Sequence, residues 1–538
     1  MTGTQVKNPM GWLAAIVAIA ALLRLAAFSG YQGGDDRLYI QHAFELSQGR
    51  LIPDTFSHWQ SRLGMLLPLA GLMRIFGASL AVVAAIPFFW TLVTVVLGYV
   101  AGQIFYRNTR TSLLAALLVA VFPLDVIFAT QYFPDMALAA LTGIAFLAFC
   151  TAPTAVSPSV NYALSGVALG LAYLHRETAL FLLLPMFAIT FVRRRWEFRS
   201  VWFALGLASV ISAELLVFAC MFHDPWHRVR TVLNEGQFAD HPDPLVVASK
   251  PNDNEESASK DLTGSNADGT KSAMRRTEAI SPARRIYRPL LCLMGNQEFG
   301  LFFFATVLAA FSLVLRRDRP SIEPMLWLIL VGGYTLWGTV RLSGWEPLYT
   351  WPRYMSMVTI PALVLLARWL SLWQNSVWRN AAVGILVGTS LVCVYVDNTR
   401  THRSLGNQLA EFWLAHRDRD LELICAGHAY SDLFVANGFR PIERVSLLGI
   451  ARNRGSLRFD PTLEIHPDRT SLPPACYVVI PIEKSDRVPS EWKLTETVLR
   501  ARRWFVPALE WIGPSGRKLG ERLSPIEGYN VFLVAATE

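Results

Sequence analysis

The chain has 538 residues, of which 53% are hydrophobic and only 17% are charged. This balance excludes an ordinary soluble enzyme, because the apolar residues come in uninterrupted runs that are long enough to cross a bilayer. The net charge of +8 does not indicate a nucleic-acid-binding protein. The basic residues stand in short clusters beside apolar runs, as is typical of segments next to anionic lipid.

The first apolar run, residues 11–28, predicts an uncleaved membrane-spanning helix. A signal peptide is disfavoured because Arg24 interrupts the run and no small-residue cleavage site follows it. A polar loop follows at residues 29–62. Within this loop, residues 38–46 predict a helix that lies on the membrane surface.

Ten more spans are predicted downstream, at residues 81–104, 111–129, 135–150, 162–174, 179–192, 201–221, 300–315, 324–340, 354–371 and 380–396. The run from 162 to 192 would be roughly 46 Å long as one helix at 1.5 Å per residue. The hydrocarbon core is only about 30 Å thick. We therefore expect two short spans there, which meet near His175, Arg176 and Glu177.

The basic residues between spans predict the orientation of the chain in the membrane. With eleven crossings, one face collects Lys7, Arg107, Arg110, Arg193, Arg194, Arg195, Arg199, Arg316, Arg317, Arg319 and Arg379. That face is predicted to be cytoplasmic. The first loop, the loop at 222–299, the loop around Trp351 and the C-terminal tail then lie on the opposite side.

Two domains are predicted: a transmembrane domain at residues 1–398 and a soluble α/β domain at 399–538 on the non-cytoplasmic side. The outer loop 222–299 includes a polar stretch, about 240–285, that predicts a disordered insertion. In the tail we expect a helix at 405–415 and strands at 421–425, 477–481 and 529–535. Cys425 and Cys476 could form a disulfide if the tail faces an oxidising compartment. The predicted fold is an all-α polytopic bundle of about eleven transmembrane helices with a small α/β domain.

The first outer loop contains adjacent acids, Asp35 and Asp36, directly after two glycines. One carboxylate can act as a general base while the other binds a metal ion or a sugar hydroxyl. A solvated turn would explain the same pair. Tyr39, His58 and Arg62 of the same loop are candidate substrate-binding residues.

Asp135 is the second candidate acid, because it lies where two spans are predicted to meet on the outer side. Its position after Pro134 is equally typical of an ordinary helix start. Asp125 is a weaker candidate for the same reason.

His175, Arg176 and Glu177 are charged or titratable residues inside an apolar run. An ionised group at the bilayer centre costs roughly 2.5–3.5 kcal/mol on insertion scales, so such groups favour a protein-lined site. Alternatively, Arg176 and Glu177 only neutralise each other at the membrane surface.

Trp351, Arg353 and Tyr354 open the tenth predicted span from outside. The arginine can bind a lipid phosphate and the aromatic rings can stack on a sugar. An interfacial aromatic belt would explain the same residues.

These motifs together resemble the GT-C superfamily of membrane glycosyltransferases, and above all its protein O-mannosyltransferase and aminoarabinose transferase group. The resemblance covers roughly residues 10–400. It rests on Asp35-Asp36 with Tyr39, Ala43 and Gly49, on Phe76-Gly77, on Phe133-Pro134-Asp135, on the broken spans around Arg176, and on Arg353-Tyr354 with Pro361.

The resemblance implies transfer of a sugar, with inversion, from a polyprenyl-phosphate donor to an acceptor hydroxyl of a lipid, glycan or protein on the periplasmic face. Asp35 matches the family's base, and Arg353, helped by Arg176 or His175, would stabilise the departing phosphate. Such an enzyme would be a hexosyl- or pentosyltransferase of the cell envelope in the inner, or plasma, membrane. Some members bind a divalent cation near these acids, and here Asp35, Asp36 and Asp135 would be its ligands.

Two features depart from the family pattern. Asp36 stands where the group usually has Glu, and only Pro68 is present where a Pro-Pro pair is common. The sugar is therefore left open. Two other classes also remain open, a secondary transporter with broken helices and a non-catalytic envelope-assembly protein.

Overall fold

The structure, a computed structural model, describes six stretches of the chain that contain its helices, together with the single residues 408, 412 and 415 and five strands between 422 and 534. The helical stretches are residues 7–30, 35–49, 59–193, 198–238, 298–338 and 352–402. The predicted disordered insertion at 240–285 lies outside the described residues. So does most of the helix predicted at 405–415.

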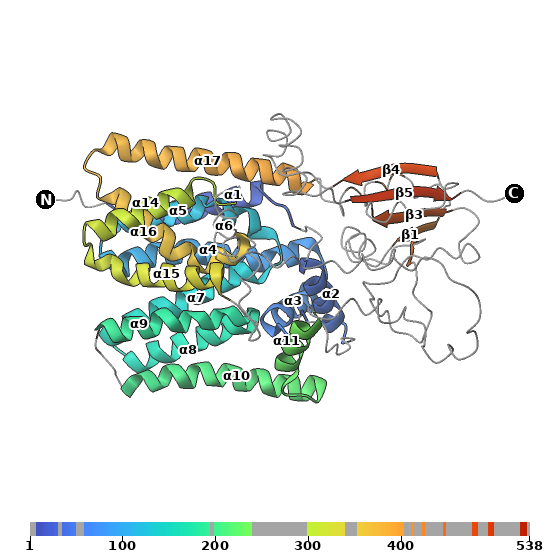
Figure 1. Ribbon diagram of the computed structural model, residues 1–538, viewed down its shortest axis with the longest axis horizontal. Helices are drawn as coiled ribbons and strands as arrows, with labels where there is room; N and C mark the ends of the chain where they lie inside the picture. Colours follow the sequence, from blue (N-terminus) through green and yellow to red (C-terminus); the bar gives the residue numbers. More distant parts are fainter. Residues whose placement is uncertain are drawn as a thin grey trace, which may run out of the picture.

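Long apolar helices pack side by side in one bundle (Figure 1). The helices of the first half are α1 (Pro9–Ala26), α2 (Asp35–Ser47), α3 (Leu63–Phe76), α4 (Leu80–Tyr106), α5 (Thr109–Val121), α6 (Pro123–Ile127), η1 (Phe128–Thr130), α7 (Pro134–Thr151), η2 (Ala152–Thr154), α8 (Pro158–His175), η3 (Glu177–Leu182) and α9 (Leu183–Arg193). Those of the second half are η4 (Phe198–Ser200), α10 (Val201–Phe222), α11 (His227–Phe238), α14 (Phe302–Leu315), η5 (Arg319–Ser321), α15 (Ile322–Trp337), η6 (Pro352–Val358), α16 (Thr359–Ser371) and α17 (Ser376–His402).

Six helical segments in the described stretches are long and apolar enough to cross a membrane, and a seventh is added if α5 and the bent α6–η1 segment form one span. The six are Pro9–Ala26, Leu80–Tyr106, Pro134–Thr154, Phe198–Phe222, Arg353–Ser371 and Ser376–Asn398. The chain is thus a multi-pass membrane protein. Other helices at predicted spans, such as α9 and α14, are shorter, so the count of eleven stays a prediction.

Two apolar runs of the sequence are each divided between two helical segments. The chain turns by 51° between α5 and α6, where Pro123 offers no N–H and Phe122 before it is extended. The run from 162 to 192 breaks at Arg176, whose backbone is extended between α8 and η3. The break expected near His175–Glu177 is therefore confirmed.

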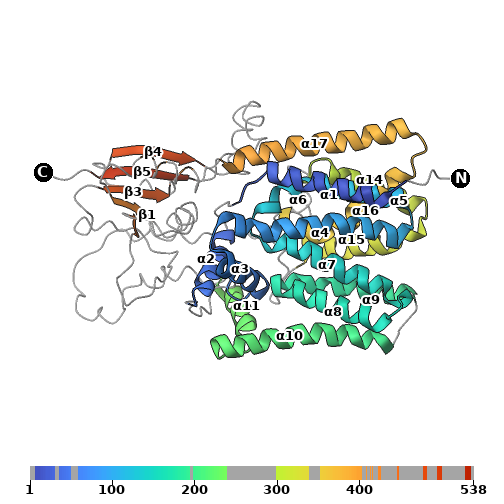
Figure 2. The same cartoon turned by 180° about the vertical axis from the view of Figure 1, so that it is seen from behind.

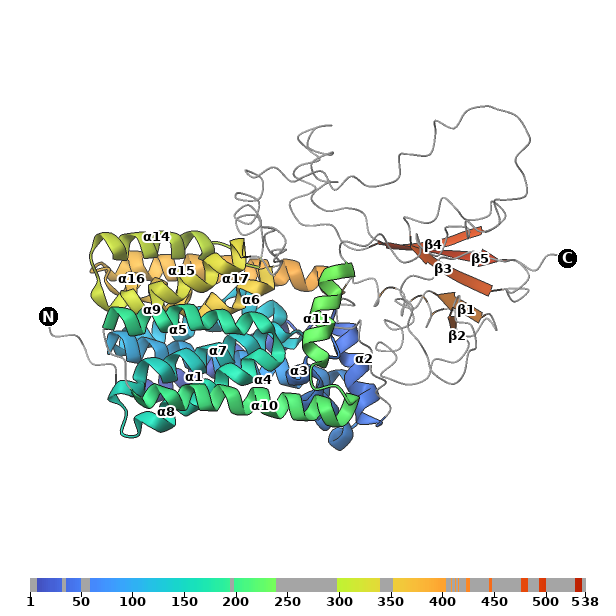
Figure 3. The same cartoon turned by 60° about the horizontal axis from the view of Figure 1, so that its bottom comes forward.

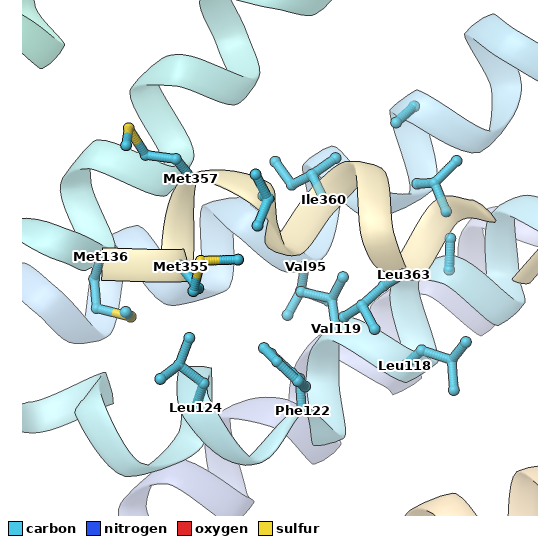
Figure 4. Close-up of a cluster of buried hydrophobic side chains, with 14 of the residues drawn as sticks. Val95, Leu118, Val119, Phe122, Leu124, Met136, Met355, Met357, Ile360 and Leu363 are labelled. Carbon is cyan, nitrogen blue, oxygen red and sulfur yellow. The ribbon is translucent and has the colours of Figure 1, made fainter. Parts of the chain in front are cut away.

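The main hydrophobic core extends through the bundle, and Figure 4 shows the part of it that includes side chains of α4, α5, α7 and α16. Val95 of α4 and Val119 of α5 lie near Ile360 and Leu363 of α16, and Met136 of α7 lies near Met355 of η6. This packing matters for function because η6 and the start of α7 are fixed by the same core.

The two ends of the bundle differ. α2 and α11 lie across the end that is nearer the strands, and Figures 2 and 3 show the same arrangement. The connections from α14 to α15 and from α16 to α17 lie at the other end (Figure 1). Arg316 and Arg317 lie in the first of these connections, and Arg379 lies in the first turn of α17. All three were predicted to face the cytoplasm.

Five strands form one sheet with the order β2-β1-β3-β5-β4. They are β1 (Glu422–Cys425), β2 (Val445–Leu447), β3 (Cys476–Pro481), β4 (Lys493–Leu499) and β5 (Gly528–Val534). β1 is parallel to β2 and β3, whereas β5 is antiparallel to β3 and β4. The three predicted strands correspond to β1, β3 and β5, while β2 and β4 were not predicted. The α/β class of the tail stays a prediction, because the segments between the strands lie outside the described part.

The strand register is incompatible with the disulfide that was considered possible between Cys425 and Cys476. Cys425 lies opposite Val479 and Cys476 lies opposite Glu422, so the two cysteines are three positions out of register. That offset is roughly 10 Å along the strands. A disulfide requires Cα atoms closer than about 7 Å.

α8 and α10 approach each other closely at Gly206, which predicts that a larger residue there lowers stability. A Cβ added at Gly206 would collide with the carbonyl oxygen of Ala163, so Gly206→Val should force the two helices apart. Overpacking of this kind costs about 1–3 kcal/mol. Thermal unfolding of the detergent-solubilised protein should show a lower midpoint for G206V. Gly384→Val on α17 is the matched control, since no atom lies within 4 Å of its added Cβ. Equal midpoints for the two variants would contradict the close approach.

Candidate active site

The candidate site is built around a fully buried carboxylate. Asp135 lies in the first turn of α7, after an extended Phe133 and a proline at the first helical position, and is 0% exposed. Its Oδ1 accepts a hydrogen bond of 3.1 Å from Nη1 of Arg176. Its Oδ2 lies 3.7 Å from Nε of Arg353. Three predicted residues from distant parts of the chain therefore meet at one point.

Aromatic rings fix the orientation of both guanidinium groups. Arg176 lies over the ring of Tyr354, 3.7 Å from its centroid, and Arg353 lies over the ring of Phe133 at 4.1 Å. Such contacts add cation–π attraction to the ion pairs and restrict rotation of the planar groups. Tyr354 and Arg176, both predicted to bind substrate, are thus in direct contact.

A small cavity of about 30 Å³ adjoins this cluster. Its walls include the guanidinium-bearing side chain of Arg176, two threonines and two tyrosines. The lining residues are Leu138, Arg176, Thr178, Tyr334, Thr335, Tyr354 and Met357. The cavity therefore combines a cation with hydroxyl donors on a partly apolar wall.

Among the described residues, Arg176 and Arg353 both lie against the carboxylate of Asp135. Arginine is well suited to bind phosphate oxygens in pairs.

The first loop reaches the same region through Arg62. Its guanidinium donates to the hydroxyl of Tyr39 and lies 3.9 Å from Oε2 of Glu177. Burial alone would lower the pKa of Arg62, but Tyr39 and Glu177 more than offset this effect and raise that pKa. Arg62 therefore joins α2 to the break after α8.

Glu177 is bound from a second side by Arg228 of α11, whose Nη2 lies 2.8 Å from Oε1. Burial would raise the pKa of Glu177, but the charges of Arg228 and Arg62 lower it to about 2. The ring of His175 is directed elsewhere: its Nδ1 lies 2.9 Å from the carbonyl oxygen of Leu171 and it packs against Gly64. The role of His175 in binding the substrate phosphate stays a prediction.

The acids of the first loop lie at the start of α2. Asp36 is fully buried, so the interpretation as a solvated turn is wrong for this residue. The backbone of Asp35 opens α2, but its side chain, like His58 and Trp351, lies outside what the structure describes. Their proposed roles stay predictions. In the described stretches no three histidine, cysteine or acidic side chains gather as a metal site would require. Because the Asp35 side chain is not among them, a cation at Asp35, Asp36 and Asp135 also stays a prediction.

Sequence analysis did not identify two important residues, Arg228 and Glu214. Arg228 binds Glu177, Glu214 and the carbonyl oxygen of Tyr173. Glu214 offered a usable signal, because it is an isolated acid within the apolar run of α10 and needs a partner there. The weaker candidate Asp125 is buried in α6 and interacts electrostatically with Arg24.

These features define a class: a multi-pass membrane protein with a buried, arginine-rich polar site at the bundle end nearer the sheet. Residues 65–219, which include Asp135 and Arg176, match the model of the family described as dolichyl-phosphate-mannose-protein mannosyltransferase. No curated protein matches the chain.

Two solved structures share the fold. One is ArnT from Cupriavidus metallidurans in the apo state, with a TM-score of 0.57 and 12% identity over 99% of this chain and 100% of that one. The other is the same protein bound to undecaprenyl phosphate, with a TM-score of 0.53 and 14% identity over 98% and 99% of the two chains. The predicted resemblance to the GT-C superfamily is confirmed. Identity this low establishes the shared fold alone.

The buried ion pairs predict a large loss of stability for Asp135→Asn. The substitution removes the negative charge that Arg176 and Arg353 share. Breaking a buried pair in this way costs about 3–5 kcal/mol. Asp224→Asn is the control, because its partner Arg230 is 63% exposed and such pairs contribute little. Thermal unfolding in detergent should show a much lower midpoint for D135N than for D224N, and similar midpoints would refute the structural importance of Asp135.

The low pKa of Glu177 predicts an acid-dependent loss of stability. Because that pKa is lowered in the folded state to about 2, ionised Glu177 stabilises the fold fully above about pH 4.5, the value near which an exposed glutamate titrates. The contribution is lost as the pH falls toward 2. Unfolding midpoints measured between about pH 5 and pH 3 should therefore fall more steeply for the wild-type protein than for Glu177→Gln. Parallel slopes would show that Glu177 is not held ionised by the two arginines.

Proposed function

We propose that the chain is an integral membrane glycosyltransferase that transfers a sugar from a polyprenyl-phosphate donor to an acceptor hydroxyl. The observation on which this proposal rests is the cluster of Arg176 and Arg353 around Asp135, beside a small cavity at one end of the bundle. Two guanidinium groups that meet at one point suit a site for a phosphate that becomes more negative during the reaction. The description of the matching family and the undecaprenyl phosphate bound to ArnT point to the same class of lipid donor.

In the proposed reaction, the acceptor oxygen forms a bond to the anomeric carbon while the bond from that carbon to the phosphate oxygen breaks. Asp35 accepts the proton of the attacking hydroxyl, and Asp36 binds a sugar hydroxyl or a cation. Arg353 and Arg176 stabilise the negative charge on the departing polyprenyl phosphate. Attack from the face opposite the phosphate inverts the anomeric configuration.

Membrane position fits the lipid substrate. The polyprenyl tail can lie in the bilayer beside the bundle while its phosphate meets the arginines at the outer end. The basic connections lie at the opposite end of the bundle, so we assign that end to the cytoplasm. We accordingly place the protein in the inner membrane, with the first loop, residues 222–299 and the α/β tail 399–538 in the periplasm. The transferred sugar is a hexose or a pentose.

The proposed base predicts a specific loss of activity. Asp35→Asn should reduce transfer of labelled sugar from polyprenyl phosphate by about 10²–10⁴-fold, the usual contribution of general base catalysis. The assay uses membranes that contain the full-length protein, with protein amount measured by immunoblotting. Asp224→Asn, which changes another acid in the same way, is the control and should retain wild-type transfer.

Two outcomes would contradict different parts of the proposal. Equal turnover by D35N and wild-type protein would exclude Asp35 as the base while leaving the transferase assignment in place. No transfer by the wild-type protein from mannosyl, glucosyl or aminoarabinosyl polyprenyl phosphates would contradict the transferase assignment itself and would favour a transporter or an assembly protein.

A further inference from the structure

The link between α8 and η3 presents two neighbouring side chains to opposite sides. The backbone of Arg176 is extended, with φ −163° and ψ 136°, and successive side chains on extended backbone point in opposite directions. Arg176 contacts Asp135 and Tyr354, whereas Glu177 contacts Arg62 and Arg228. Whatever fixes Glu177 therefore also fixes the backbone from which Arg176 extends.

Arg228 is the most strongly bound partner of Glu177. Its side chain is 3% exposed, and its Nε donates to Oε1 of Glu177 at 2.9 Å. Its Nη1 donates to Glu214 of α10 at 2.5 Å, and its Nη2 donates to the carbonyl oxygen of Tyr173 in α8 at 2.7 Å. The same guanidinium lies over the ring of Tyr173, 4.2 Å from the centroid. One side chain thus joins α11, α8, α10 and η3.

The charges around Glu177 differ from those around Asp135. Arg62 and Arg228 are balanced by Glu177 and Glu214, so these four side chains have no net charge. A neutral, closely packed set of ion pairs gives no electrostatic attraction for a phosphate. Arg176, by contrast, pairs with Asp135 and lines the cavity. This difference favours a role in which Arg228 supports the structure of the site over one in which it contacts the substrate.

We propose that Arg228 is a positioning residue that acts through Glu177 to keep Arg176 beside Asp135 and the cavity. This inference rests on the proposed function, because Arg176 is the residue expected to meet the phosphate of the donor. It also links α11, which lies across the outer end of the bundle, to the reacting end of the substrate. Small displacements of a group in an active site can reduce the rate by 10²-fold.

The test compares Arg228→Lys with Arg230→Lys. Lysine at 228 retains the positive charge, so Glu177 and Glu214 are not left without a counterion. A single ammonium cannot reproduce the several directed contacts of the guanidinium. Arg230 lies on the same helix but is mostly exposed, which makes R230K the matched control. If Arg176 is no longer held in position, R228K should lower kcat/KM for sugar transfer by about 10–100-fold. The kcat/KM of R230K should equal that of the wild-type protein.

A double-mutant cycle separates positioning from general damage to the fold. If Arg228 acts through Arg176, R228K should reduce kcat/KM less than about twofold further in a protein that already has Arg176→Lys. Losses that multiply would show that Arg228 affects turnover by another route, and would overturn the proposal. So would wild-type kcat/KM for R228K.

Hydrogen exchange gives a readout that does not depend on activity. In R228K the backbone amides of η3 should exchange several-fold faster than in the wild-type protein, while those of α4 should be unchanged. R230K should show no difference in either helix. Unchanged exchange in η3 would refute the positioning role even if no sugar donor is found. Wild-type protein without transfer but with this exchange pattern would contradict only the proposed function.

Discussion

The site depends on one buried carboxylate between two guanidinium groups. Asp135 has no exposed surface, and an isolated charge in such surroundings would be strongly disfavoured. Arg176 and Arg353 make its burial tolerable, and the acid in turn permits two arginines to lie close together. The acid and the two arginines therefore depend on one another, and this arrangement keeps the guanidinium of Arg176 beside the cavity. In a low-dielectric region that charge acts more strongly on an anion than it would in water.

Helix breaks bring these three side chains together. Asp135 stands where α7 begins, Arg176 where α8 ends, and Arg353 in the short η6 before α16. Each residue is therefore at a helix end rather than in the middle of a span. Polar side chains at these positions can meet at one membrane face while the apolar bodies of the helices pack against one another and lipid. The core around Val95, Val119 and Ile360 fixes two of the three helix ends.

Sequence analysis predicted residues whose chemistry was unusual for their surroundings. Arg176 was found because charge within an apolar run is costly, and the structure places it in the cluster. The break near His175 was predicted because one helix from 162 to 192 would be longer than the hydrocarbon core is thick. Arg228 was not found because it lies in a polar segment, where an arginine is not unusual. Its importance comes from the contacts of its side chain with α8 and α10. The three strands with continuous apolar residues were predicted, whereas the three-residue β2 was too short to produce a pattern. The possible disulfide between Cys425 and Cys476 could not be decided from the sequence, because register within a sheet cannot be read from spacing in the chain.

Arginines outside the site follow a shared pattern that shows why the site arginines differ. The last carbonyl groups of a helix lack partners within the helix, and lipid cannot supply them. Arg24 donates to the carbonyl oxygen of Ala120 near the end of α5, Arg193 to that of Cys150 near the end of α7, and Arg228 to that of Tyr173 near the end of α8.

Each of these three arginines also interacts with an acid from another element, as Arg193 does with Glu323 at 2.6 Å. Their charges are thus balanced by a helix terminus and a carboxylate together. Arg176 and Arg353 contact ring faces and share the carboxylate of Asp135, which fixes their orientation. Arginine therefore closes helix ends in one setting and, at Arg176, lines a cavity in the other.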